Sequence, residues 1–159
     1  MKQILNNYIS KTIAILLIVL STACKKDSND SSNELNSNTF TAIVEGEDFT
    51  STDILAVQLS ASKKITITAE SKDSKVIQLI LPGDITEGTF KIFDLLNTPQ
   101  ILGGYSPVTS VDSFEPLTSG NITITSFNDA TNTIEGTFNA NTSTITITQG
   151  AFNIKFKEL

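Results

Sequence analysis

Histidine, arginine and tryptophan are absent from this chain of 159 residues, and cysteine occurs once. Without histidine, the usual serine–histidine–acid triad is excluded, and no GxSxG motif marks a nucleophilic serine. A single cysteine forms no internal disulfide, and without a CxxC pair or histidine the chain offers no zinc site. Catalysis, if present, would have to use carboxylates, lysines or hydroxyl groups.

A basic surface is also lacking. The formal net charge is −6, and no run of lysines exceeds two adjacent residues. A nucleic-acid-binding protein needs a basic stripe to displace counterions from the phosphates, so nucleic acid is excluded as a partner. Gly103-Gly104 is followed by no helical pattern, so no phosphate-binding loop is expected. We expect no cofactor and no metal.

The first 23 residues have the layout of a secretory signal peptide. Lys2 and Lys11 form a short basic region, and the apolar run IAILLIVL covers residues 13–20. Eight apolar residues are far fewer than the ~20 that cross a bilayer as a helix. Small residues follow at positions 21–23, where cleavage is expected.

Cys24 is the predicted lipid attachment site, because the cleavage region resembles a bacterial lipobox. Ala23 precedes the cysteine as expected, whereas Ser21 stands where Leu, Val or Ile is usual, with Leu20 one position earlier. An acylated cysteine is unreactive, and several acyl chains make a durable membrane anchor. The alternative is a plain signal peptide cut near Ala23, which would leave a chance cysteine.

Residues 24–38 are predicted to form a flexible tether, since Leu35 is the one apolar residue after Cys24. Lys26-Asp27 and Asp30 resemble the surface-export signal of Bacteroidetes lipoproteins, although an ordinary solvated spacer would have the same composition. We therefore expect a lipid-anchored protein of the outer membrane, facing either the medium or the periplasm.

Residues 39–159 are predicted to form one all-β domain, an antiparallel β-sandwich or partly open barrel. Apolar and polar residues alternate, and ITIT occurs three times, with isoleucine expected inward and threonine outward. The run VIQLIL at 76–81 predicts a central strand covered on both faces. Lys64 is among the lysines that we expect to protect sheet edges. The pattern predicts about nine strands: 39–44, 54–61, 64–70, 76–81, 89–93, 121–125, 133–140, 144–148 and 152–157.

The tetrapeptide EGTF occurs at 87–90 and again at 135–138. In strand phase, its glycine and phenylalanine share one face. The simplest interpretation is a glycine beside a core phenylalanine. The two copies could mark equivalent strands in the two halves of the sandwich, or the four-residue match could arise by chance.

The least regular stretch is 94–119, which contains three of the four prolines. Long irregular connections in compact domains are often functional. Its apolar side chains could form a recognition surface, or they could hold the loop against the domain. The candidates are Leu102, Tyr105, Val108 and Phe114.

Carboxylates and amides gather in the predicted turns. Glu45, Glu47 and Asp48 surround Gly46, and paired carboxylates can hydrolyse glycosides. Asn128, Asp129 and Asn132 could bind calcium, but no DxDxDG loop is present. The same residues are favoured in β-turns, and we expect exposed turns here rather than a site.

Several ordered motifs resemble a family of small Bacteroidetes outer-membrane lipoproteins that is known as a domain of unknown function. They run from FxAxVxGxxF at 40–49, through both EGTF copies and GxIxIT at 120–125, to ITxGxF at 147–152. The resemblance implies export and a β-rich fold, and it supplies no catalytic residue.

The expected function is a non-enzymatic binding or envelope-structural module whose ligand is an extracellular glycan or protein. Two alternatives stay open. One is a carboxylate-dependent hydrolase, and the other is an inhibitor of an exported protein acting through residues 94–119.

Overall fold

The computed structural model describes residues 38–93, 100–108 and 113–159. Cys24, the predicted signal peptide and the predicted tether lie outside these residues. The described chain contains strands and turns without a helix, which confirms the predicted all-β fold. Its strands are β1 Thr39–Val44, β2 Glu47–Leu59, β3 Lys64–Ser71, β4 Val76–Pro82, β5 Gly88–Lys91, β6 Leu102–Ser106, β7 Glu115–Pro116, β8 Ser119–Asn128, β9 Thr133–Asn141, β10 Thr146–Lys155 and β11 Lys157–Glu158.

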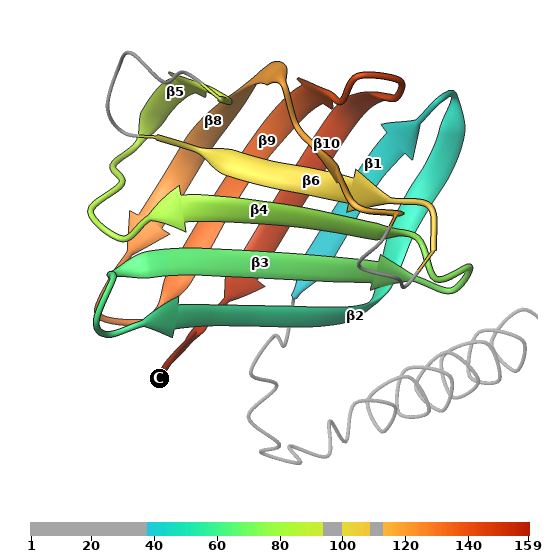
Figure 1. Ribbon diagram of the computed structural model, residues 1–159. Coiled ribbons are helices and arrows are strands. Elements are labelled where there is room, and N and C mark those ends of the chain that lie inside the picture. The colour runs from blue at the N-terminus through green and yellow to red at the C-terminus, as the bar shows by residue number, and fades with distance from the viewer. Residues whose placement is uncertain (1–37, 94–99, 109–112) are drawn as a thin grey trace, which may run out of the picture. The chain divides into compact units, whose positions relative to one another are not determined.

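The strands form one curled sheet in the order β5-β8-β9-β10-β1-β2-β3-β4-β6-β7, and β11 pairs with β2. All neighbours on this path are antiparallel. The sheet folds back on itself as two layers (Figure 1). Sheet A contains β5, β8, β9, β10 and β1, and sheet B contains β3, β4, β6 and β7.

Strand β2 belongs to both layers. Residues 47–50 pair with β1 in sheet A, and the rest of the strand pairs with β3 in sheet B. The register of the β2–β3 pair shifts between Ser51 and Asp53, where the strand bends. A bulge of this kind strengthens the local twist, and here it lets one strand turn the corner between the layers.

The core between the layers follows the predicted alternation. Of the six isoleucines in the three ITIT segments, Ile145 is half-buried and the other five are fully buried. Phe40 lies at the centre of an aromatic cluster, with its ring 5.4 Å from that of Phe138 and 6.1 Å from that of Phe49. Phe152 stacks on Phe40 at 6.3 Å. These rings account for much of the apolar area that the fold buries.

Two glycines of sheet A accommodate rings of this cluster. Gly136 pairs with Phe152, and Gly150 pairs with Phe138 on the same two strands, β9 and β10. A Cβ atom at Gly150 would lie 2.3 Å from the Phe138 ring, and one at Gly136 would lie 2.8 Å from the Phe152 ring. Each ring therefore occupies the space that a side chain on the opposite strand would fill.

This arrangement corrects the interpretation of the EGTF repeat. The two copies fall on β5 and β9, which both belong to sheet A and are separated by β8. They do not mark equivalent strands in two halves of the sandwich. Phe138 is buried in the core, whereas Phe90 is half-buried at the sheet margin. The tetrapeptide fits any strand that needs a small residue two positions before an aromatic ring. Its repetition therefore does not indicate structurally equivalent strands.

Three further expectations were wrong in detail. The segment 94–119 contains β6 and β7, because Gly103 and Gly104 pair with β4 as strand residues although their composition suggested a loop. Strand β4 is central, but Val76, Gln78 and Ile80 on its outer face are half-buried rather than covered. Lys64 lies on the interior strand β3 and protects no edge.

Within the described ranges, no helix is long and apolar enough to cross a membrane.

Candidate ligand-binding site

The two layers differ in the residues that they turn outward. Outward positions on sheet A are polar, as at Asn121 and Thr123 on β8 and at Thr137 and Asn139 on β9. Outward positions on sheet B include apolar residues, and the paired row Val57, Thr66, Ile80 and Leu102 crosses four strands. Apolar surface exposed on a sheet face is the less common case and marks a candidate binding surface.

A pocket opens at the margin of this face, where β5 of sheet A meets β4 and β6 of sheet B. There Ile92 and Ile101 pair as a parallel bridge, and the backbone N–H of Phe93 donates a hydrogen bond to the carbonyl of Ile101 at 2.8 Å. This seam joins the two ends of the curled sheet. Beside it lies a pocket of about 420 Å³, which we name the seam pocket; its lining residues are Lys64, Ile80, Pro82, Asp84, Ile85, Thr86, Phe90, Gln100 and Leu102.

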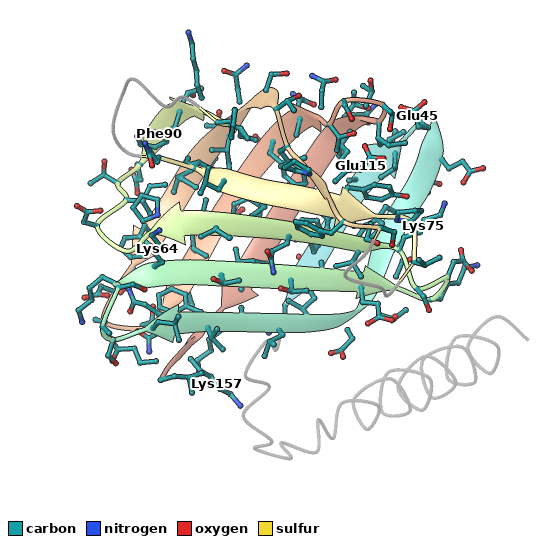
Figure 2. All side chains as sticks on the ribbon, viewed as in Figure 1. Glu45, Lys64, Lys75, Phe90, Glu115 and Lys157 are labelled. Atoms are coloured by element: carbon teal, nitrogen blue, oxygen red, sulfur yellow. The ribbon has the colours of Figure 1, made fainter. Side chains whose placement is uncertain are left out.

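The seam pocket combines an apolar lining with polar groups at its rim. Ile80, Phe90 and Leu102 are half-buried in it, and Lys64 and Asp84 are exposed. In volume and make-up it resembles small-molecule sites, which commonly measure ~300–1,000 Å³ and lie at the mouths of β-barrels. Figure 2 shows Lys64 and Phe90 at the same end of the molecule, away from Glu45, Lys75 and Glu115.

Lys64 is the cation of the seam pocket. In the described part of the chain its ammonium forms no ion pair, and Asp84 in the same pocket is not within salt-bridge distance of it. The ammonium can therefore donate hydrogen bonds to a ligand without first leaving a protein partner. Together with the Phe90 ring and the aliphatic lining, it suits a small molecule that has an apolar body and hydrogen-bond acceptors at one end.

A second pocket, of about 350 Å³, lies at the opposite end of sheet B and is lined by hydroxyl-bearing and charged residues. Its lining residues are Asp48, Thr50, Thr52, Ser71, Lys72, Asp73 and Lys75. Lys75 Nζ contacts Glu47 Oε2 at 2.9 Å in an exposed ion pair. This hydrogen bond lowers the pKa of Glu47 and raises that of Lys75. The charge of Lys75 is thus already engaged by a protein carboxylate.

Glu115 on β7 is held by hydroxyl groups from the turn between β9 and β10. Its carboxylate accepts hydrogen bonds from Thr142 and Thr144 at 2.8 Å each, and a longer one from Ser143 at 3.4 Å. The hydrogen bonds from Thr142 and Thr144 lower the pKa of Glu115. The carboxylate ties the edge of sheet B to a turn of sheet A, which is a structural role.

The four predicted recognition residues divide between surface and core. Tyr105 is 4% exposed and faces the core from β6, and burial raises the pKa of its phenol. Val108 and Phe114 are exposed, at 49% and 39%. A Cβ atom at Gly104 would lie 2.2 Å from the Phe114 ring, so this ring covers the outer face of β6. Leu102 alone of the four lines the seam pocket.

Lys64, Asp84 and Phe90 are site residues that sequence reasoning did not select. Lys64 was predicted to protect a sheet edge, and Phe90 was predicted to be a core residue. The sequence predicted a strand at 89–93, and the structure alone shows that Phe90 lies on a four-residue strand at the edge of the sheet. The proximity of the three residues depends on the closure of the seam, which no local pattern encodes.

The predicted carboxylate groupings do not form a buried pair in the described residues. Glu45, Glu47 and Asp48 are all exposed around the turn that joins β1 to β2. Over the described ranges, no group of three or more Asp, Glu, Cys or His residues is arranged to hold a metal ion. Asn128 instead accepts a hydrogen bond from the backbone of Thr131, as a turn residue does.

A family profile described as Domain of unknown function (DUF6252) matches residues 36–154. The match covers most of the chain, so the chain belongs to this family. No curated protein and no solved structure matches the chain. The family description assigns no activity, and the function must be argued from the geometry of the site.

Proposed function

We propose that this member of the DUF6252 family is a non-enzymatic binding module, anchored to the outer membrane by lipid on Cys24. The seam pocket is the observation that carries the binding role. Its aliphatic lining and Phe90 ring would bury the apolar body of a small ligand, and Lys64, Thr86 and Gln100 would donate hydrogen bonds to the polar end. A glycan fits this description through one sugar face on the ring and hydroxyl groups at the rim.

Binding is favoured over the hydrolase alternative by the state of the carboxylates. A glycosidase needs two carboxyl groups flanking one bond, one of them with a raised pKa so that it can donate a proton. Among the described residues, the seam pocket is lined by one carboxylate, Asp84. Hydrogen bonds lower the pKa values of Glu47 and Glu115. A general acid needs a raised pKa, so neither carboxylate suits that role.

Binding is tested by a fragment and monosaccharide screen followed by NMR chemical-shift mapping. We expect hits to shift the backbone resonances of Lys64, Ile80 and Leu102. Leu102→Asn places an amide in the apolar lining and should weaken hits at least about tenfold. Leu55→Asn is the matched control, since Leu55 lies on the outer face of sheet B but outside the pocket. The proposal would be contradicted by hits that shift resonances scattered over sheet A, or by an equal loss of affinity in Leu102→Asn and Leu55→Asn.

The anchor is tested separately on intact cells, by comparing wild type with Cys24→Ala. We expect labelled palmitate to be incorporated into wild type alone, and wild type alone to fractionate with the outer membrane. Protease added outside the cells then shows which side the domain faces. If both forms are soluble and unlabelled, the lipid anchor is wrong while the binding proposal is unaffected.

A further inference from the structure

Of the six large apolar side chains that are exposed among the described residues, three lie together on β2 and beside it. Leu55 is 63% exposed and Leu59 47% exposed on the outward positions of β2, with the half-buried Val57 between them. Leu159 is 68% exposed, and its backbone pairs with Gln58 and Ser60, which places it beside Leu59. We name these four side chains, together with Lys157, the tether-side patch.

The patch lies on the side where the chain enters the domain. Asn38 Oδ1 accepts a hydrogen bond from the backbone N–H of Lys155 at 2.7 Å. Lys157, two residues later, pairs with Val57 in the middle of the patch. Figure 1 shows the start of β1, the C-terminal segment and β2 together along the lower side of the domain, and Lys157 projects from this side in Figure 2.

The charge around the patch differs in sign from that of the chain. From Ser51 to Lys64 and from Lys155 to Glu158, the ionised side chains are four lysines and two carboxylates, whereas the whole chain carries −6. The lysines are Lys63, Lys64, Lys155 and Lys157, and the carboxylates are Asp53 and Glu158. Exposed leucines flanked by lysines form the combination that sits at the boundary of an anionic bilayer.

We infer that the tether-side patch rests on the phospholipid surface to which the chain is anchored. This inference depends on the proposed lipid at Cys24. Fourteen residues separate Cys24 from the domain, and even fully extended they span about 50 Å. The anchor therefore holds the domain at a high effective concentration at the membrane, where a contact too weak to recruit free protein becomes populated. Because the chain enters beside the patch, this side can reach the bilayer with the shortest span.

The orientation also has a consequence for the binding site. Lys64 belongs both to the lysines around the patch and to the lining of the seam pocket. With the patch on the lipid, the polar face of sheet A points away from the membrane, and the pocket lies near its surface. A ligand that is itself an amphipathic component of the envelope would then meet the pocket without leaving the membrane.

The absence of tryptophan makes a clean experiment possible. The chain from residue 24 onward, which contains the compact unit 35–159, is coupled through the Cys24 thiol to a maleimide phospholipid. The vesicles contain phosphatidylethanolamine, phosphatidylglycerol and brominated phosphatidylcholine. L59W and T137W each introduce one fluorophore, in the patch and on the outer face of sheet A respectively. Bromine quenches tryptophan only on contact with the lipid chains.

We expect quenching of L59W to exceed that of T137W at least about threefold, and L55S/L159S in the L59W background to remove most of the difference. L55W serves as a second reporter should L59W not fold. Equal quenching at the two positions, or stronger quenching of T137W, would overturn the inference. Since the lipid is attached chemically, this result does not depend on acylation in cells, which the palmitate experiment decides.

Discussion

The Glu115 carboxylate accepts a hydrogen bond from the Thr142 hydroxyl at 2.8 Å, across 27 positions of sequence and between the two layers of the fold. Glu45 acts at the end of this turn, accepting a hydrogen bond from the backbone N–H of Thr146, the first residue of β10. The β9–β10 turn is thus held by two carboxylates from different parts of the chain. It is one of the points at which sheet B is fixed to sheet A.

Glu115→Gln should lower the thermal midpoint near neutral pH and have little effect in acid, once the pH is below the folded pKa of Glu115. The hydroxyl hydrogen bonds hold the pKa of Glu115 below its ordinary value of 4.5. A group whose folded pKa is depressed adds stability above its unfolded pKa, and this stability is lost as the pH falls through the folded pKa. The measurement is the midpoint of wild type and variant across the acid range.

Glu47→Gln is the matched control, because Glu47 is also an exposed carboxylate with a lowered pKa but its partner is the Lys75 ammonium. Exposed ion pairs are screened in concentrated salt, where the Debye length falls to about 3 Å. The small effect of Glu47→Gln should vanish in molar salt, whereas that of Glu115→Gln, whose partners are neutral hydroxyl groups, should persist. Equal salt sensitivity would contradict this account of Glu115.

Gly150→Ala should destabilise the fold by about 1–3 kcal/mol or more, since a methyl group there meets the Phe138 ring at 2.3 Å. Phe138→Leu in the same chain should recover part of the loss by making room, although it costs stability on its own. Gly46→Ala is the contrasting change, because nothing lies within 4 Å and only its φ of +86° opposes a side chain. Urea denaturation of wild type, Gly150→Ala, Phe138→Leu and the double variant measures the coupling energy between the two positions.

The reciprocal glycine–phenylalanine pairs show where prediction from sequence succeeded and where it stopped. Alternation identified the inward face of β3, β8 and β9, because burial of one face imposes a period of two. Which strands face one another depends on pairing between distant segments. Gly150 and Phe138 meet only because β9 and β10 are neighbours with one register shift. No local pattern specifies that register.

The same limit applies to the candidate site. The segment 94–119 was predicted to be irregular because glycine and proline are rare inside strands. Gly103 and Gly104 nevertheless form β6, since Leu117 and Phe114 occupy the space beside them. Leu102 was selected as a recognition residue, but Lys64 and Phe90, which line the pocket with it, come from strands 38 and 12 residues earlier in the sequence. Closure of the sheet unites them.

Gln58→Leu should stabilise the protein by about 1–2 kcal/mol. Gln58 is 2% exposed at an inward position of β2, and its Oε1 accepts no hydrogen bond from the described residues. A buried acceptor without a donor costs free energy that leucine, of similar volume, does not. Gln149→Leu, at an exposed position within β10, should change stability little. A loss of stability in Gln58→Leu would show that the amide makes an interaction essential to the core.

Phe40→Ala should cost about 3–5 kcal/mol, because Phe40 is fully buried and contacts three other rings. Leu55→Ala, at an exposed position on sheet B, should stay within about 0.5 kcal/mol of wild type. The free energy of unfolding in urea measures both. A large loss in Leu55→Ala would mean that the tether-side patch packs on the protein itself.

Ile101→Ala should destabilise the fold by about 2–5 kcal/mol and, in addition, open the seam. Ile101 is fully buried, and its carbonyl accepts the hydrogen bond from the Phe93 N–H that joins the ends of the curled sheet. Ile67→Ala removes an equally buried side chain from the middle of β3, far from either end of the strand order. Both variants should lose similar stability, but hydrogen exchange at the Phe93 amide should accelerate beyond the global loss only in Ile101→Ala. Equal acceleration in the two would mean that the seam opens only with global unfolding, and the seam pocket would then be as rigid as the core beneath it.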